Sequence, residues 1–207
     1  KLMYDRQTQT LWSSLHGEPV LGELVGRDLQ LKRHYIVRTS WAHWRQQHPQ
    51  TLVLARDTGF GLEYEKESAY QSYFDSDKTM FPVAWRDKRL KAKDWVYGIV
   101  LNGLQKAYAV KKLQKKPLLH DRFAGENLLV LTEKDELAVR IYQSESIVFE
   151  KRASPEVLID ADGSEWRIHE NALVRNSDQK QLPRLSGHLA YWFGWYAFFP
   201  DTEVWKK

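Results

Sequence analysis

One spacing pattern occurs twice in this sequence and limits what the chain can fold into. Residues 41–53 and residues 192–204 both read W-x-x-W-x-x-x-x-P-x-T-x-V, without an insertion in either copy. Chance rarely repeats so many fixed positions, and a repeated sequence unit is expected to build the same structural unit each time. The pattern therefore predicts an internal duplication.

The match continues upstream of the tryptophan pairs. The segment from Asp5 to Trp12 corresponds to the segment from Asp160 to Trp166, with one residue fewer in the second copy. Each of these tryptophans is followed by a polar stretch and then by a leucine-containing segment. The similarity thus extends beyond the W-x-x-W pattern itself.

The two copies differ in how much sequence precedes them. Residues 95–159 stand before Asp160, whereas only residues 1–4 stand before Asp5. Strands without their partners leave backbone donors and acceptors open, so something should pair with them. We expect an amino-terminal segment of the same protein to do so, with a neighbouring copy of the chain as the second candidate. The expected divisions are a truncated first repeat (1–55), an aromatic connecting loop (56–94) and a complete second repeat (95–207).

The two W-x-x-W segments are predicted to be short helices. Thr39 or Ser40 can cap the first helix and Ser186 the second, because their hydroxyls accept hydrogen bonds from free amides at a helix start. Tryptophans three residues apart share one helical face and would pin each helix onto a sheet, and proline ends each helix. The expected structural core of the repeats comprises Trp41, Trp44, Pro49, Trp166, Trp192, Trp195 and Pro200.

The second repeat carries clear strand signals. Residues 95–101 are β-branched and aromatic, and Asn102-Gly103 then predicts a two-residue hairpin turn into a strand at residues 105–110. Further strands are expected at 51–54, 128–132, 138–142, 146–150 and 202–205, and a short helix at 110–116. The predicted fold is α+β and mostly β, with two similar β-rich lobes that each carry one short Trp-bearing helix.

Composition excludes several classes of function. The chain has no cysteine, so disulfides, thiol catalysis and thiolate metal sites are absent from it. Its net charge of +4 is small and spread along the sequence, which does not indicate nucleic-acid binding. No apolar run is long enough to span a membrane. The seven histidines show no pair at the helical metal-ligand spacing, so neither a metal nor a cofactor is expected.

Aromatic and polar residues suggest candidate binding positions. Asp5 beside Arg6, near Trp12, could bind a polar ligand, or Asp5 could simply cap its own turn. A hydrolytic acid–base site formed by Asp5, Arg6 and His43 is a further hypothesis. Tyr64 and Tyr70 lie in the connecting loop, whose aromatic side chains are expected to wrap a neighbouring unit or to bind a sugar or peptide.

The sequence resembles the bacterial family known as Domain of Unknown Function 3179. The resemblance rests on the motifs around Asp5 to Trp12, Trp41 to Thr51, Asn102 to Tyr108 and Trp192 to Thr202, and it covers nearly the whole chain. It implies a two-repeat protein of the cell envelope or periplasm, with a cysteine-bearing segment that this chain lacks. The leading hypothesis is therefore a non-catalytic or accessory part of such a protein. The alternatives are an aromatic-lined ligand-binding module and, less favoured, a hydrolase.

Overall fold

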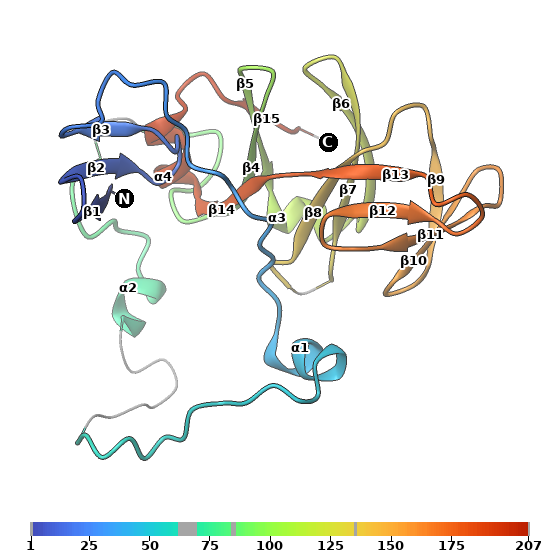
Figure 1. Ribbon diagram of the computed structural model, residues 1–207, viewed down its shortest axis with the longest axis horizontal. Helices are drawn as coiled ribbons and strands as arrows, with labels where there is room; N and C mark the ends of the chain where they lie inside the picture. The colour runs from blue at the N-terminus through green and yellow to red at the C-terminus, as the bar shows by residue number, and fades with distance from the viewer. Residues whose placement is uncertain (1, 62–69, 84–85, 135, 207) are drawn as a thin grey trace.

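The computed structural model describes residues 2–61, 70–83, 86–134 and 136–206. Most of the regular structure in these residues is β, as the sequence predicts, and the strands form three sheets (Figure 1). The helices are short: α1 (Trp41–Gln47), α2 (Gln71–Asp75), α3 (Val110–Leu113) and α4 (Trp192–Phe198).

The largest sheet has eight strands and curls into an almost closed barrel. Its spatial order is β6 (Leu118–Phe123), β7 (Glu126–Thr132), β8 (Val139–Gln143), β13 (Gln181–Leu185), β12 (Ala172–Arg175), β11 (Glu165–Ile168), β10 (Val157–Asp160) and β9 (Phe149–Ser154). The two edge strands are linked by His120 of β6, because its Nε2 lies 2.9 Å from the carbonyl oxygen and 3.1 Å from the amide nitrogen of Phe149. Trp166 is fully buried among leucines inside the curl.

A four-stranded sheet packs beside this barrel. Its order is β14 (Gly187–Tyr191), β4 (Trp95–Leu101), β5 (Leu104–Ala109) and β15 (Glu203–Val204). The predicted hairpin is confirmed: Asn102 and Gly103 adopt φ of 50° and 77°, the left-handed values that such a turn requires. β14 adds to β4 in antiparallel fashion and β15 adds to β5 in parallel, so both outer edges of the hairpin are occupied.

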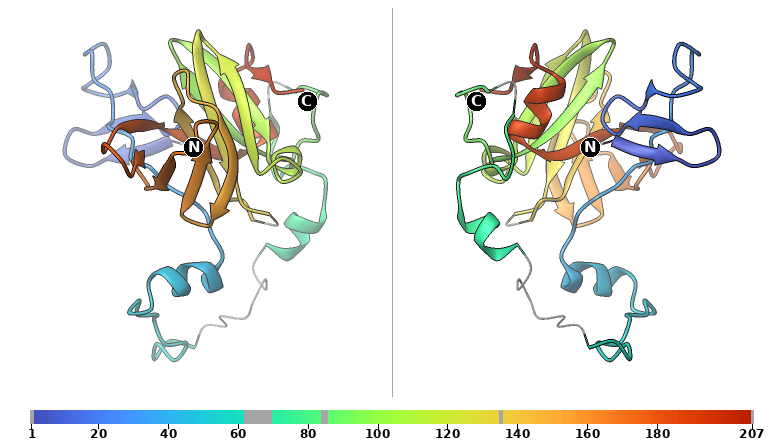
Figure 2. Two further views of the ribbon diagram at one scale, coloured as in Figure 1. Left: turned by 90° about the vertical axis from the view of Figure 1, so that its right-hand side faces the viewer. Right: turned by 90° about the vertical axis from the view of Figure 1, so that its left-hand side faces the viewer.

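The amino-terminal residues form a separate small sheet. Its strands are β1 (Leu2–Asp5), β2 (Thr10–Ser13) and β3 (Pro19–Leu21). The His16 ring, in the turn after β2, lies 4.8 Å from the ring of Phe199, so this sheet borders the end of α4. In contrast, α1 and α2 lie below the sheets, as both side views also show (Figures 1 and 2).

Several local expectations need correction. Ser186 does not cap α4, since residues 187–191 pair with β4 and the helix begins only after Tyr191, whose side chain makes no capping bond. Residues 51–54 form no strand because no described strand lies beside them. The strand expected at 146–150 begins only at Phe149, since a turn occupies the preceding residues.

The described aromatic side chains of the connecting loop are mostly exposed rather than wrapped around a neighbour. This holds for Phe60, Tyr70, Phe74 and Phe81. Within the described part of the chain, no helix is long and apolar enough to cross a membrane.

Candidate interaction site at the first tryptophan helix

The α4 segment shows how the W-x-x-W pattern folds when it is buried. The indole Nε1 of Trp195 donates a hydrogen bond to Thr202 Oγ1 at 3.0 Å. The Phe199 amide donates to the Trp195 carbonyl, and the Thr202 amide donates to the Phe199 carbonyl at 3.2 Å. The rings of Trp195 and Phe199 lie 4.4 Å apart between centroids. These contacts fix the indole against the turn that follows the helix.

The α1 segment repeats each of these contacts. Trp44 Nε1 donates to Thr51 Oγ1 at 2.9 Å, the His48 amide donates to the Trp44 carbonyl, and the Thr51 amide donates to the His48 carbonyl at 3.1 Å. The Trp44 and His48 rings lie 4.0 Å apart. The residues that end the two helices also match in backbone conformation, with φ and ψ of −129° and 67° at His48 and of −132° and 73° at Phe199.

The two helices differ in their surroundings. Trp195 is 0% exposed and Trp192 is 1% exposed, whereas Trp44 is 38% exposed and Trp41 is 49% exposed. The turns that follow differ even more, because Trp205 is 5% exposed whereas Leu54, at the matching position, is 93% exposed. The same local geometry is therefore buried in one place and open to solvent in the other.

The cover over α4 comes from the β4–β5 hairpin. Gly98 of β4 lies directly beneath the Trp195 ring, and a Cβ atom at this position would come within 2.5 Å of three ring carbons. Ala107 of β5 is fully buried in the same cluster as Trp192, Trp195 and Val204. A hairpin with small residues at these two positions thus seals the tryptophan face of α4.

Further matching positions align the segments on either side of α1 with the strands on either side of α4. Gln30-Leu31-Lys32-Arg33 aligns with Gln181-Leu182-Pro183-Arg184. Both arginines bond to the carbonyl four residues beyond the aligned tryptophan: Arg33 Nη2 to His16 at 2.9 Å, and Arg184 Nη1 to Glu170 at 3.0 Å. On this alignment residues 36–40 correspond to β14, and residues 52 and 53 to β15.

Residues 36–40 belong to no sheet of the described chain. No backbone–backbone hydrogen bond joins residues 32–39 or 52–54 to any other described residue. Instead, side chains hold the segment: Arg184 Nη2 donates to the Ile36 carbonyl at 3.0 Å, and the Thr39 and Ser40 hydroxyls donate to Glu136 at 3.0 and 2.7 Å. Burial raises the pKa of Glu136, but these two hydroxyls, together with His43 and the Ser40 amide, outweigh that effect and the pKa lies below its usual value.

We refer to the large exposed apolar side chains of α1 and of the segments that flank it as the α1 surface. They are Ile36, Trp41, Trp44, Leu52, Val53 and Leu54. Exposed apolar side chains gathered in this way on one stretch of chain indicate an interaction site. Pro49, expected in the repeat core, lies in the turn between α1 and the last three of these residues and is also exposed.

The other side of α1 borders a polar cavity of about 290 Å³. His43 and His48 line it together with His169 and an arginine–glutamate network. Arg152 contacts Glu133 at 2.8 Å, and Arg140 contacts Glu170 at 2.7 Å. Burial raises the pKa of Glu170, but Arg140 and Arg184 outweigh that effect and keep it below its usual value. The Glu170 carboxylate is therefore held ionised by its salt bridges, which does not suit a general acid.

The positions predicted around Asp5 do not join this cavity. Asp5 accepts hydrogen bonds from the Thr8 hydroxyl and the Gln7 amide, and these bonds lower its pKa. Arg6 is exposed, Trp12 is buried in β2 opposite Met3, and β1 lies apart from α1 and its His43 (Figure 1). Asp5 thus sits in the turn-capping arrangement. Tyr70 begins α2 at a φ of 66° and is exposed, while Tyr64 lies outside the described residues.

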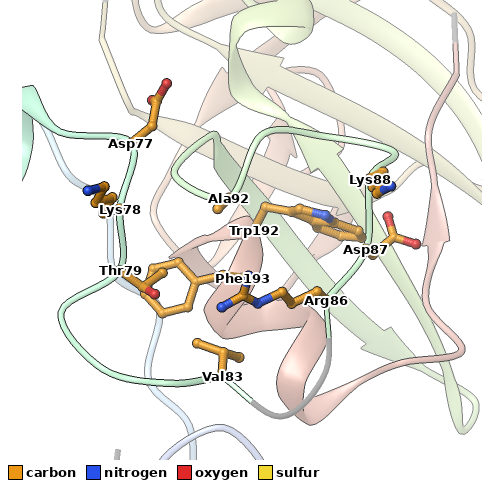
Figure 3. A pocket seen from close by; sticks show the side chains of 10 residues that line it. All are labelled: Asp77, Lys78, Thr79, Val83, Arg86, Asp87, Lys88, Ala92, Trp192 and Phe193. Atoms are coloured by element: carbon orange, nitrogen blue, oxygen red, sulfur yellow. The ribbon is translucent and has the colours of Figure 1, made fainter.

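A second cavity of about 510 Å³ lies beside α4 (Figure 3). Trp192 and Phe193 contribute aromatic surface to it, and Arg86 and Lys78 contribute positive charge. Trp192 Nε1 is buried and has no hydrogen-bond partner among the described residues. Within the described residues, no group of three or more potential metal ligands converges anywhere.

Sequence reasoning singled out both tryptophan pairs but missed that one pair would be exposed. The β4–β5 hairpin covers α4, but the W-x-x-W pattern is the same in both segments and carries no signal for which of them is covered. The polar cavity gave no sequence signal, because its arginines and glutamates come from separate strands and turns.

Comparisons with known proteins agree with the resemblance. A family model described as protein of unknown function (DUF3179) matches residues 1–202. No curated protein and no solved structure matches the chain.

Proposed function

The chain belongs to the DUF3179 family of proteins of unknown function, and on that premise we propose that it is a polypeptide-binding accessory part of a two-repeat protein. In this proposal, the sequence arose by internal duplication, and the α1 surface receives the chain segment that completes the first repeat. The location in the bacterial cell envelope and the accessory role follow from the resemblance and are proposed with it.

The observation that supports the proposal is that α1 and α4 share one local geometry but differ in solvent exposure. Trp44, Thr51 and His48 repeat the contacts of Trp195, Thr202 and Phe199, yet Trp195 is 0% exposed and Trp44 is 38% exposed. Burying one large apolar side chain is worth about 1.5–3 kcal/mol. A surface with six such side chains therefore gains substantially from a partner.

The kind of partner follows from what covers α4. There the cover is polypeptide, through the backbone of β4 and β5 paired with β14 and β15. Residues 36–39 and 52–53 have no backbone–backbone hydrogen bond to any described residue, which suits the addition of strands. We take an amino-terminal segment of the same protein as the source, since the family resemblance implies two repeats.

A neighbouring copy of this chain is the less suitable source. Both outer edges of its β4–β5 hairpin are already occupied, by β14 and by β15. To cover the α1 surface of another molecule, that hairpin would have to leave its own sheet and expose Trp192 and Trp195. Such an exchange would expose the apolar surface of α4 while burying that of α1, with no net gain in buried surface.

The test is fluorine NMR on protein containing 5-fluorotryptophan. Each signal is assigned by one Trp→Phe variant, and solvent exposure is measured from the shift between H₂O and D₂O. In the 207-residue chain we expect Trp41 and Trp44 to report solvent, and Trp192 and Trp195 to serve as shielded controls. In the product of the complete natural coding sequence, Trp41 and Trp44 should become shielded.

Two outcomes would contradict the proposal. Solvent-exposed Trp41 and Trp44 in the complete product would remove the proposed partner. Shielding that appears only when the concentration of the 207-residue chain is raised would assign the partner to a second copy instead.

A second candidate function is small-ligand binding in the cavity beside α4. The buried Nε1 of Trp192 favours it, because this donor has no acceptor within the part of the chain that the structure describes, and such a donor is costly. A ligand hydroxyl or carbonyl could accept from it, as in sugar or peptide recognition. Ligand-induced changes of the Trp192 fluorine signal, absent in Phe193→Ala, would support this function, and a screen of sugars and short peptides without such a change would exclude it.

A further inference from the structure

The residues that cover α4 indicate which kind of polypeptide could bind to α1. This inference rests on the proposed function and concerns the sequence of the partner. The indole of Trp44 is held against its turn by the same hydrogen bond, at nearly the same length, as the indole of Trp195. We therefore match the Trp44 ring, which is 38% exposed, to the Trp195 ring that covers β4.

The Trp195 ring lies so close to the backbone of β4 that position 98 has no room for a side chain. At Gly98 a Cβ atom would lie 2.5 Å from Cδ2, Cε2 and Cε3 of Trp195. Attractive carbon–carbon contacts need about 3.5–4.0 Å, so even alanine would force the ring and strand apart. The backbone φ of Gly98 is not in the left-handed region, so close approach of the ring accounts for glycine at this position.

The pairing registers supply the second requirement. Gly98 pairs with Ala107 across the hairpin and with His188 of β14. Ala107 in turn pairs with Val204 of β15 and is fully buried among the α4 tryptophans. The aligned positions on the α1 surface are Val37 and Val53. A strand beside residues 36–40 would thus place its glycine opposite Val37, and the returning strand would place a small residue beside Val53.

We infer that the α1 surface binds a β-hairpin whose first strand carries a glycine under Trp44 and whose second strand carries alanine or another small residue, with the spacing of Gly98 and Ala107. The first strand pairs antiparallel with residues 36–40, and the second pairs parallel with residues 52–53. Side-chain contacts from Arg184 and Glu136 already tether Ile36 and Ser40, which lowers the entropic cost of adding the strand.

A library of disulfide-cyclised hairpins provides the probe. The hairpins carry the sequence of residues 95–108, with flanking cysteines and with the positions of Gly98 and Ala107 randomised, and they are selected on the intact chain. Cyclisation replaces the neighbouring strands that an isolated hairpin needs for stability. The matched control target is the Trp44→Ala variant, in which the ring that imposes the glycine is absent.

We expect the selected hairpins to carry glycine at the first position and a small residue at the second. Replacement of the selected glycine by valine should weaken binding about tenfold or more, because overpacking at a close contact is strongly unfavourable. The same replacement should have little effect on binding to Trp44→Ala. Large residues accepted at the first position, binding indifferent to Trp44, or no selected hairpin at all would each overturn the inference.

The two proposals fail separately. If Trp44 becomes shielded in the complete natural product but the library shows no glycine preference, the surface binds polypeptide in another way and only this inference falls. If Trp44 stays exposed in the complete product, both proposals fall.

Discussion

Replacement of the matched tryptophans by alanine should give very different losses of stability. Trp195 is 0% exposed, packs on Gly98 and Phe199, and donates to Thr202, so Trp195→Ala removes a complete set of core contacts. Such substitutions cost about 3–5 kcal/mol. Trp44 has the same local bonds but lacks the sheet above it, so we expect Trp44→Ala to cost less than about 1 kcal/mol.

The assay is equilibrium urea unfolding of the 207-residue chain, followed by near-ultraviolet circular dichroism and by tryptophan fluorescence. Agreement of the two signals is needed before a single free energy of unfolding is assigned. Thr202→Ala and Thr51→Ala are matched controls for the indole hydrogen bonds. We expect about 1–3 kcal/mol for the buried pair and little for the exposed pair.

The reasoning would be refuted if Trp44→Ala and Trp195→Ala destabilised the chain equally. That result would mean that α1 is already covered in the 207-residue chain. If the proposed amino-terminal segment covers α1 in the product of the complete coding sequence, the two losses should converge there, because Trp44 would then acquire the contacts that Trp195 has.

Three further predictions concern single residues of the folded chain. Gly98→Val should lower the free energy of unfolding by at least about 1–3 kcal/mol, since its side chain would collide with Trp195, and urea midpoints measure this directly. Burial, with a smaller contribution from the charge of Arg33, lowers the pKa of His188 to about 4. The free energy of unfolding should therefore be highest above about pH 6.5 and should fall as the pH drops from about 6.5 towards 4, because the unfolded chain then binds a proton that the folded chain does not. His188→Gln should remove that fall, as measured by melting curves in acid. Asp160→Ala should lower the free energy of unfolding by about 3 kcal/mol, because its buried carboxylate accepts hydrogen bonds from two backbone amides and from Trp166. Asp5→Ala should cost clearly less, and equal losses in the two variants would contradict this.

Much of the second half of the fold could be predicted from local sequence. The β4–β5 hairpin follows from a β-branched run and Asn102-Gly103, and both tryptophan helices follow from their spacing and their prolines. The predicted start of α4 was wrong because residues 187–191 pair with β4 as a strand. The helix therefore begins after Tyr191 and not at a cap formed by Ser186. Local signals say nothing of such long-range pairing.

The candidate site was only half predictable. The sequence pattern identified Trp41 and Trp44 but predicted a core position for both tryptophans. Their exposure depends on what lies above them, which is a property of tertiary contact rather than of the helix itself. Asp5 was equally ambiguous, because a carboxylate that caps its own turn and one that binds a ligand have the same local sequence.

Residue-resolved hydrogen exchange tests the central claim most directly. The amides of residues 36–40 and 52–54 should exchange rapidly in the 207-residue chain, while those of β14 and β15 are protected by pairing with β4 and β5. In the product of the complete coding sequence, the first set should become protected and the second should not change. Amides of residues 36–40 and 52–54 that exchange equally fast in both proteins would contradict the account.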